Sequence, residues 1–562
     1  MESKNKIIIY QLLPRLFSNT VPNCVYDGTI EENGCGKMND IDMAVLNQIR
    51  GLGISHVWYT GVIRHATTTD YSQYGIPRQH PGIVKGKAGS PYAITDYYDV
   101  DPDLATNVEN RMGEWEDLIA RTHEAGMKVV MDFVPNHLAR EYKSICKPDG
   151  IKDFGDDDNI DKEFSADNNY YYCVGKPFEP YFDCGDYKEY PAKATGNDVF
   201  NNRPVRNDWY ETVKLNYGVE YTQDGRKIKH FSPIPDTWHK MTAILLFWAS
   251  KGIDGFRCDM AEMVPTEFWK YAIGVVKKQY PNVDIIGEVY EPSLYRDYLS
   301  AGFDYLYDKV GMYDCLRNVI CGLNPASDIT QRWQWTDDIQ DHMLYFLENH
   351  DEQRIASPFF AGNAGKGRAA LLVSALMRTN PMMIYFGQEL GEPGMDKEGF
   401  SGEDGRTTIF DYWTVQTIRR WRNGGKFDGT QLTDKEKELQ AYYTKILNLC
   451  NKEKAIREGE FFDVMYANMD NSAMNIHRQY AFLRKAGKEL IIVVANFDDR
   501  GSHASVRIPS HAFSYLDIPE EEKEYTAKDL LTGVAEDITL SPDGFVHLEL
   551  PALGGKVLKI RL

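Results

Sequence analysis

Eight short apolar segments, each rich in Ile, Val, Tyr or Phe, recur along the first three quarters of the chain. They cover residues 6–17, 56–62, 128–134, 252–259, 283–290, 303–309, 342–351 and 382–389. Between them lie segments with the apolar spacing of amphipathic helices, at 44–52, 115–125, 241–250, 268–279 and 368–377. Continuously apolar strands that alternate with helices are typical of a parallel sheet covered by helices. The pattern predicts an α/β fold, an eight-fold (β/α)8 TIM barrel.

Two departures from this alternation predict further structural units. The segment after the third strand is rich in Asp, Tyr, Asn, Gly and Pro and lacks a periodic apolar pattern, which indicates an irregular insertion. After a helical segment at 433–458, alternating strands predict an antiparallel β-domain, at 479–483, 490–496, 504–508, 544–550 and 556–562. We therefore expect a catalytic barrel at 1–137 and 232–456, an inserted subdomain at 138–231 and a C-terminal β-sandwich at 457–562.

Composition excludes several classes of protein. The 562 residues include 43% hydrophobic and 26% charged residues, as in globular domains, which excludes a fibrous or mostly disordered chain. The 63 Lys and Arg against 83 Asp and Glu give a net charge of −20, which would repel phosphate backbones and anionic lipids. We expect no nucleic-acid partner and, without any apolar run near the roughly 18 residues required, no membrane span. The oligomeric state stays open.

The N-terminal residues and the cysteines bear on the compartment. Residues 1–10 lack the long apolar core and cleavage site of a secretory signal, which predicts a cytoplasmic protein as the sequence stands. A periplasmic or secreted location is the alternative if a signal has been removed. The nine cysteines are odd in number and form no CxxC pair, so we expect mostly reduced core thiols.

Polar residues end four of the predicted barrel strands. In a β/α barrel, catalytic groups come from the C-terminal ends of the strands. The third, fourth, fifth and seventh strands end at Asp132-Phe-Val-Pro-Asn136-His137, Arg257-Cys-Asp259, Gly287-Glu288 and Glu348-Asn-His350-Asp351. Because these ends meet at one face of a barrel, the sequence predicts a single site that contains three carboxylates.

The three carboxylates Asp259, Glu288 and Asp351 suit glycosidase chemistry. Hydrolysis of an acetal needs a proton for the leaving oxygen and a negative group facing an oxocarbenium-like centre. Crowding of like charges should raise the pKa of at least one carboxyl, whereas Arg257, two positions before Asp259, should keep Asp259 ionised. Adjacent strands carry Asp259 and Glu288, which favours the short carboxyl separation, about 5 to 5.5 Å, of a retaining mechanism.

The segments DFVPNH, GIDGFRCD, GEV and FLENHD resemble, in order and spacing, the four signature regions of the α-amylase superfamily of glycoside hydrolases. The resemblance covers the whole chain. It implies that Asp259 is the nucleophile, Glu288 the general acid/base and Asp351 the stabiliser of the transition state. It also implies substrate contacts by four further residues, namely Tyr92, which would stack under a sugar ring, His137, Arg257 and His350.

The resemblance implies a retaining α-amylase-type hydrolase that cleaves α-1,4-glucosidic bonds through a covalent glucosyl-enzyme. The expected partner is an α-glucan or malto-oligosaccharide derived from starch, such as a maltodextrin. The alternatives are a 4-α-glucanotransferase, a cyclodextrin-degrading enzyme and an α-glucosidase. A catalytically silent binding or assembly homologue is a remote alternative, because such proteins normally lack one of the carboxylates that this chain retains.

Three positions bear on specificity and metal binding. Gly89 stands where pocket-type relatives often carry an Asp, which favours a cleft open to longer chains. Glu262 and Met263 stand where many α-amylases have a Lys-His pair. Asn136 matches a position that often binds calcium, so a structural Ca2+ between barrel and insertion is possible. Retaining glycoside chemistry itself requires no cofactor.

Overall fold

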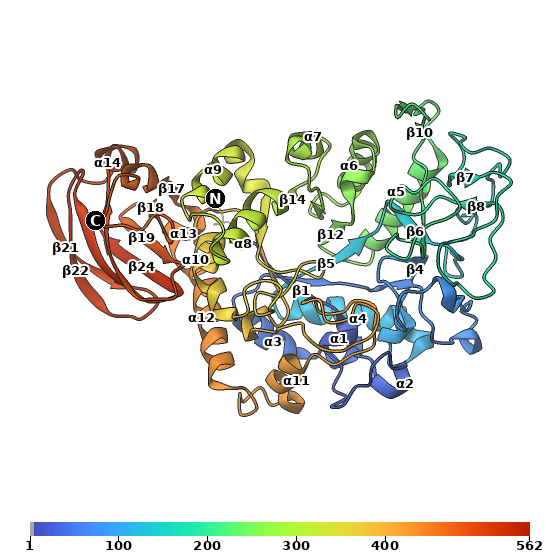
Figure 1. Ribbon diagram of the computed structural model, residues 1–562, viewed down its shortest axis with the longest axis horizontal. Helices are drawn as coiled ribbons and strands as arrows, with labels where there is room; N and C mark the ends of the chain where they lie inside the picture. Colours follow the sequence, from blue (N-terminus) through green and yellow to red (C-terminus); the bar gives the residue numbers. More distant parts are fainter. Residues whose placement is uncertain (1–4) are drawn as a thin grey trace.

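The computed structural model describes residues 5–562, so residues 1–4 of the predicted barrel segment lie outside the described residues. Parallel strands close into a barrel in the order β1-β16-β15-β14-β13-β12-β5-β2 (Figure 1). These are β1 (Ile8–Leu12), β2 (His56–Tyr59), β5 (Lys128–Phe133), β12 (Gly255–Cys258), β13 (Asp284–Gly287), β14 (Tyr305–Tyr307), β15 (Met343–Phe346) and β16 (Met382–Tyr385). Each strand lies inside one of the predicted apolar segments, which confirms the (β/α)8 barrel.

The interior of the barrel is a packed apolar layer that also holds a buried arginine. Seven of the barrel strands contribute its buried apolar side chains, namely Ile9, Trp58, Val130, Ile286, Tyr307, Leu344, Phe346 and Met383. From β12, Arg257 projects into the same layer, with its guanidinium 5.2 Å from the Trp58 ring centroid and 5.5 Å from that of Tyr307. Because a buried charge is costly unless it is paired, Arg257 requires anionic partners at this position.

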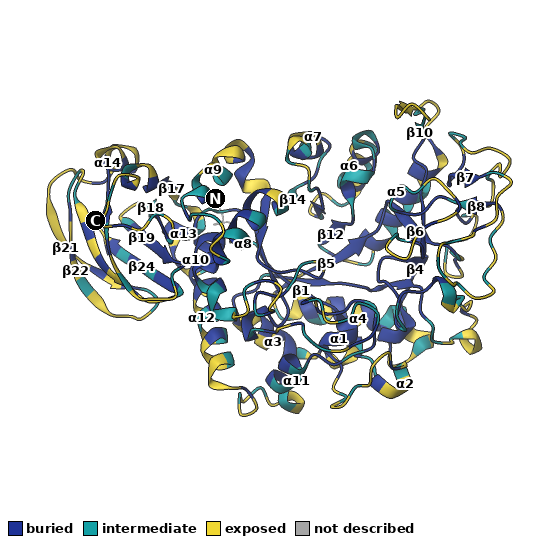
Figure 2. Cartoon of the chain, in the orientation of Figure 1, coloured by how far each residue is buried: buried dark blue, intermediate teal, exposed yellow. Residues whose placement is uncertain are grey.

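Helices surround the barrel; several bury one face and expose the other, whereas α10 is buried almost throughout (Figure 2). They are α1 (Pro14–Phe17), α2 (Ile30–Asn33), α3 (Met43–Gly51), α4 (Arg111–Glu124), α5 (Asp236–Ala249), α6 (Thr266–Gln279), α7 (Tyr295–Ser300), α8 (Asp314–Ile320), α9 (Asp328–Trp335), α10 (Arg368–Leu376), α11 (Gln416–Arg422), α12 (Asp434–Lys452) and α13 (Lys454–Glu458). A capping box between Thr433 and Glu436 starts α12, because each side chain accepts a backbone N–H that the first turn leaves free. Both α12 and strand β19 of the C-terminal region pack against α10, which joins that region to the barrel.

Short strands and long loops make up the segment between β5 and α5. They are β6 (His137–Ala139), β7 (Tyr172–Cys173), β8 (Ala192–Lys193), β9 (Thr212–Lys214), β10 (Val219–Tyr221) and β11 (Lys227–Lys229). Strand β6 pairs with β9, with His137 opposite Lys214, so the insertion is tied to the end of the third barrel strand. A second long excursion follows β2 and contains the antiparallel pair β3 (Ile63–His65) and β4 (Ile94–Val100). Both excursions lie at the end of the barrel opposite the C-terminal region (Figure 1).

The C-terminal region is antiparallel, as predicted. Six strands form a sheet in the order β17-β18-β19-β24-β21-β22, and β20 pairs separately with β23. The elements are β17 (Glu460–Asp463), β18 (Gln479–Ala486), β19 (Glu489–Asn496), β20 (Ser502–Arg507), α14 (Ser510–Tyr515), β21 (Lys523–Asp529), β22 (Ala535–Leu540), β23 (Phe545–Leu550) and β24 (Gly554–Arg561). The sequence did not predict β17, β21 and β22. In β21 and β22 every second side chain is exposed or half-buried and polar, so these strands carry little apolar signal.

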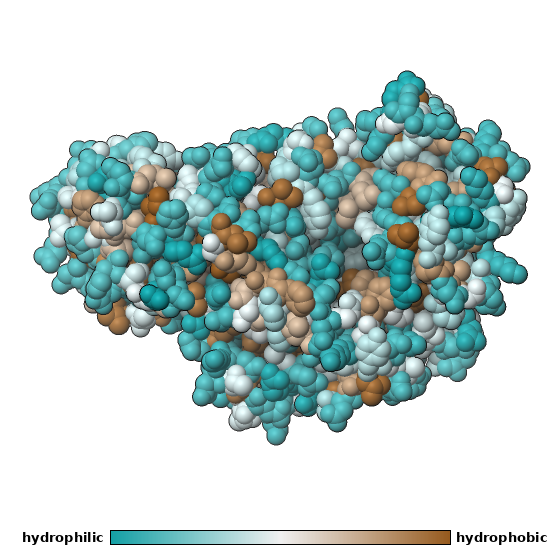
Figure 3. All heavy atoms as spheres, in the orientation of Figure 1, coloured by the Kyte–Doolittle hydropathy of each residue, from teal (hydrophilic) through white to brown (hydrophobic). Residues whose placement is uncertain are grey.

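The face of the molecule in Figure 3 is mostly hydrophilic, and its hydrophobic residues form small scattered groups. Among residues 5–562, helices with both the length and the apolar character for a membrane crossing are absent.

Candidate active site

The candidate catalytic residues continue the hydrogen-bonded ladder of the barrel. Cys258 pairs with Gly287 in the register between β12 and β13, and Glu288 N donates to Cys258 O over 3.1 Å. Asp259 N donates to Phe133 O over 2.8 Å. Both carboxylates are therefore held by rigid strand ends, which fixes them to the precision that catalysis requires.

Arg257 links the two carboxylates that follow these strands. Its Nη1 donates to Asp259 Oδ1 over 2.8 Å, and its Nη2 lies 2.7 Å from Glu288 Oε1. Burial by itself would lower the pKa of Arg257. The nearby Glu288 and Asp259, together with two tyrosines, have the opposite and larger effect, so the pKa of Arg257 lies well above its usual value. The arginine that the sequence placed beside Asp259 therefore acts on both carboxylates.

Asp132 is a further carboxyl group in this cluster. Its Oδ2 accepts from Trp58 Nε1 over 3.0 Å, and its Oδ1 lies 3.4 Å from Arg257 Nη1. Burial raises the pKa of Asp132 to about 7, although Arg257 and Trp58 oppose the shift. Burial also raises the pKa of Asp259, with added repulsion from Glu288 and Asp132. The ion pair with Arg257 opposes this rise in the pKa of Asp259.

Two hydrogen-bond donors and one ion-pair partner hold Glu288. Besides the ion pair with Arg257, Tyr290 OH donates to Oε1 and Met260 N donates to Oε2, each over 2.8 Å. Met260 reaches this position with a φ of +44°, a left-handed backbone that is uncommon outside glycine. Glu262 fixes the loop after Glu288, because its Oε2 accepts from Tyr290 N over 2.9 Å.

Two histidines and a tyrosine enclose the space above the carboxylates. His350 Nε2 lies 2.6 Å from Tyr92 OH, and His350 Nδ1 lies 2.8 Å from Gln11 Nε2. Burial lowers the pKa of His137 and of His350 to about 3, so both rings are neutral at physiological pH. Neutral rings can each donate one hydrogen bond and accept another, as recognition of sugar hydroxyls requires.

A cavity of about 410 Å³ opens above this cluster, between the barrel and the insertion. Six of the seven predicted catalytic and substrate-binding residues line it, namely Tyr92, His137, Asp259, Glu288, His350 and Asp351. The seventh, Arg257, lies beneath its floor. The side chain of Asp351 is 45% exposed and so has the freedom to follow a substrate. The structure thus brings the predicted residues together at one site.

Asn136 lies behind this site, and its surroundings do not fit a calcium ion. Asn136 Oδ1 accepts from Lys214 Nζ, whose ammonium also lies 2.8 Å from Asp198 Oδ1 and 3.3 Å from Met263 O. These three oxygens come from the barrel, the insertion and the segment after Asp259. The buried lysine supplies the positive charge at the point where they converge, so a divalent cation would have to displace it.

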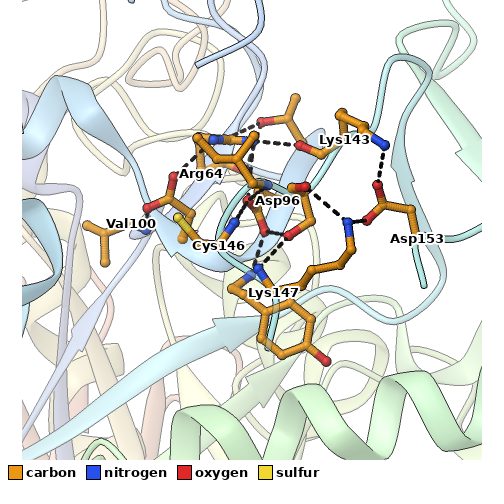
Figure 4. Close-up of polar contacts among 12 residues, drawn as sticks. Arg64, Asp96, Val100, Lys143, Cys146, Lys147 and Asp153 are labelled. Carbon is orange, nitrogen blue, oxygen red and sulfur yellow. Dashed lines mark hydrogen bonds and ion pairs between the residues drawn. The ribbon is translucent and has the colours of Figure 1, made fainter. Parts of the chain in front are cut away.

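Asp96, Asp99 and Cys146 form a second cluster of potential metal ligands (Figure 4). Both carboxylates are already paired with cations. Arg64 lies 3.4 Å from Asp96 Oδ2 and donates to Asp99 Oδ2 over 3.0 Å, and Arg111 Nε donates to Asp99 Oδ1 over 2.7 Å. Backbone N–H groups of residues 145 and 146 also donate to Asp96. This cluster therefore fastens the start of the insertion to β4.

Four groups at the site were not assigned a role from the sequence. Asp132 stood among the polar residues that end the third strand, and Tyr290 lies two residues after Glu288 on the same side of its segment. Lys85 and Glu211 also line the cavity, but they belong to irregular loops. Their positions depend on contacts between distant segments, which no local pattern records.

Comparison with known proteins agrees with this geometry. The family described as "Alpha amylase, catalytic domain" matches residues 11–428, and that described as "Alpha amylase, C-terminal all-beta domain" matches residues 469–561. The chain belongs to the α-amylase family of glycoside hydrolases, and it is an enzyme of the glycosidase class.

Its relatives are distant. "Alpha-amylase 3" of Dictyoglomus thermophilum is 25% identical over 392 residues, which cover 66% of this chain and 68% of the relative. An "Oligo-1,6-glucosidase" of Bacillus cereus is 23% identical over an alignment that is 623 positions long and covers 95% of this chain and 97% of the relative. The crystal structure of a "noncanonic maltogenic alpha-amylase" from Thermotoga neapolitana has a TM-score of 0.64 at 19% identity and covers 99% of both chains.

Proposed function

We propose that the enzyme hydrolyses α-1,4-glucosidic bonds of malto-oligosaccharides with retention of configuration. The observation that supports this most strongly is the position of Arg257, which contacts Asp259 and Glu288 at 2.8 and 2.7 Å. One guanidinium holds both carboxyls close together, which favours the short separation of a retaining site over the wider separation of an inverting site.

The geometry assigns a role to each oxygen of Asp259. Oδ1 is held by Arg257, whereas Oδ2 has His137 Nε2 at 4.0 Å and faces the cavity. Oδ2 attacks the anomeric carbon while Glu288 transfers its proton to the departing glycosidic oxygen. The products of this step are a covalent glucosyl-enzyme and a sugar with a free hydroxyl. Glu288 then removes a proton from water, which attacks the same carbon and releases Asp259.

Asp351 and His350 would hold the hydroxyls of the reacting sugar. The open side of Asp351 and the neutral ring of His350 suit hydrogen bonds to neighbouring hydroxyl groups. The ring of Tyr92 provides an apolar face in the same cavity for the sugar to stack on. A protonated Asp132 carries no negative charge. The positive charge of Arg257 is then shared among fewer carboxylates, and this favours the ionised form of Asp259 that a nucleophile requires.

A time course with maltoheptaose, resolving every product by length, tests the proposal, with Asp259→Asn as the inactive control. We expect products shorter than the substrate. Products longer than maltoheptaose would instead indicate a glucanotransferase, in which a sugar replaces water as the acceptor. Cleavage of panose and isomaltose in preference to maltoheptaose would point to the α-1,6 specificity in the name of the Bacillus cereus relative.

A further inference from the structure

Three segments meet at one side of the active-site cavity and form what we call its wall. They are the loop before β4, the insertion and the loop after β16. Ala88 N donates to Phe410 O over 3.0 Å, which joins the first of these segments to the third. Gly86 allows this approach, because it has a φ of +66° and a Cβ there would lie 2.2 Å from Phe410 O.

A buried ion pair joins the first segment to the insertion. Lys85 Nζ lies 3.0 Å from Glu211 Oε2, with 10% and 5% of the two side chains exposed. The ammonium also lies 5.3 Å from the ring centroid of Tyr210. Both charged residues line the cavity. Within residues 5–562, Glu211 Oε2 has no hydrogen-bond partner apart from this ion pair, so it can accept a bond from a ligand.

The barrel order places this wall opposite the leaving group. Glu288 and Tyr290 follow β13. Two more cavity residues lie on the same side, Lys309 after β14 and Glu352 after β15. Lys85, Glu211 and Phe410 follow β2, β5 and β16, which belong to the other arc of the barrel. The sugar that leaves lies on the side of its proton donor. The far side of the retained sugar, with its non-reducing end, therefore faces Lys85 and Glu211.

We propose that Lys85 and Glu211 bind the hydroxyl groups at the non-reducing end of the glucan, so that the enzyme removes short sugars from chain ends. The inference rests on the proposed function and adds which bonds of the glucan the enzyme cleaves, namely those near the non-reducing end. Lysine donates and the carboxylate accepts, so together they match a hydroxyl group, which does both. A chain that continued past the retained sugars would meet these two side chains and would have to displace their buried ion pair.

This inference replaces the open cleft that Gly89 suggested. Gly89 has a φ of +73°, and a Cβ there would lie 1.6 Å from Ala66 O, so a larger residue at this position would displace the backbone. An aspartate cannot close the pocket from here. In this chain the closure comes from Lys85 and Glu211 instead.

The direct test compares two substrates of the unmodified enzyme, p-nitrophenyl maltoheptaoside and the same compound with an ethylidene group on the non-reducing O4 and O6. An enzyme that acts on chain ends should cleave the blocked compound about 100-fold more slowly. Equal rates would overturn the inference and leave the proposed function intact. Failure to cleave either compound, with Asp259→Asn as the baseline, would overturn both.

Variants assign the effect to the ion pair. Lys85→Met and Glu211→Gln should each lower kcat/KM for maltotriose about tenfold, because each removes a hydrogen-bonding group from the retained sugar. Lys87→Met is the matched control, since Lys87 lies two residues away in the same loop and pairs with Asp27 at the surface. In the Lys85→Ala/Glu211→Ala double variant, the rate ratio of blocked to unblocked substrate should rise toward one. An unchanged ratio in a variant with normal melting temperature would contradict the assignment.

Discussion

Oε1 of Glu288 lies 2.7 Å from Nη2 of Arg257 in the interior of the barrel, where the two side chains are 3% and 1% exposed. The contact makes the proposed acid and the proposed nucleophile parts of one charged unit, since the same guanidinium donates to Asp259. Removal of one member changes the electrostatic environment of the others. The predictions below therefore combine kinetic readouts with measurements of stability.

Asp259→Asn and Glu288→Gln should each lower kcat by about 10⁴-fold on maltoheptaose, because each removes a group that forms or breaks bonds. Both substitutions keep the size of the side chain, so circular dichroism and the melting temperature should show a folded protein. The enzyme should be assayed after separate expression and purification of each variant. Near-normal turnover by either variant would rule out the assigned mechanism, provided that the rate is proportional to the concentration of the purified variant.

Stability should respond to the protonation of Asp132. Its pKa is about 7 in the folded protein and near 3.8 when exposed, so between these values the folded state binds the proton more tightly. Asp132 therefore stabilises the fold at low pH relative to high pH, and this contribution is lost as the pH rises from about 4 to 7.

Asp132→Asn removes this titration. The melting temperature of the variant, relative to the parent, should rise between pH 5 and pH 8, by an amount that corresponds to at most about 3 kcal/mol. Asp117→Asn is the control, because Asp117 lies exposed on the outer face of α4, away from the site. A difference in melting temperature that stays constant across this range would show that Asp132 titrates outside it.

The sequence predicted the barrel because each strand is continuously apolar and buried on both faces. Strand β5 is an example, with five of its six residues buried. Strands β21 and β22 were not predicted, since their polar residues face solvent at one side of the C-terminal sheet. The carboxylates were predictable because a polar residue at the end of an apolar strand has few alternative positions in a barrel.

The remaining parts of the site depend on contacts between segments far apart in the sequence. Lys85 and Glu211 meet only because two irregular loops pack against each other across the cavity. Lys214 is an unremarkable strand residue in the sequence, yet its ammonium lies among oxygens from three segments. Neither arrangement can be predicted from the local sequence. Asn136 therefore suggested a calcium site, whereas the structure places the ammonium group of Lys214 beside it.

Because Lys214 supplies this charge, the enzyme should not depend on calcium. Dialysis against EDTA should leave its melting temperature and its activity unchanged. Lys214→Ala should destabilise the protein by about 3 to 5 kcal/mol, since it leaves Asp198 and Asn136 without their cation. Added Ca2+ should restore part of the stability of this variant by occupying the vacated position.

Lys229→Ala provides a control for Lys214→Ala. Lys229 also lies in the insertion and pairs with Glu267, with 53% and 43% of the two side chains exposed, so its loss should be small and indifferent to Ca2+. Inactivation of the parent enzyme by EDTA, reversed by Ca2+, would show that a metal site exists in spite of the lysine.

Tyr290 should affect catalysis through the hydrogen bond of its hydroxyl group to Glu288, and substrate binding through the apolar face of its ring. Tyr290 OH donates to Glu288 Oε1 over 2.8 Å, and the residue lines the cavity on the side of the leaving group. Tyr290→Phe should lower kcat about tenfold with little change in KM, because only the hydrogen bond to Glu288 is lost. Tyr290→Ala should in addition raise KM for maltoheptaose, since it also removes a surface for the departing sugar. Steady-state kinetics of the two variants separate these effects, and equal kinetic constants for Tyr290→Phe and the parent would show that the hydroxyl does not act on Glu288.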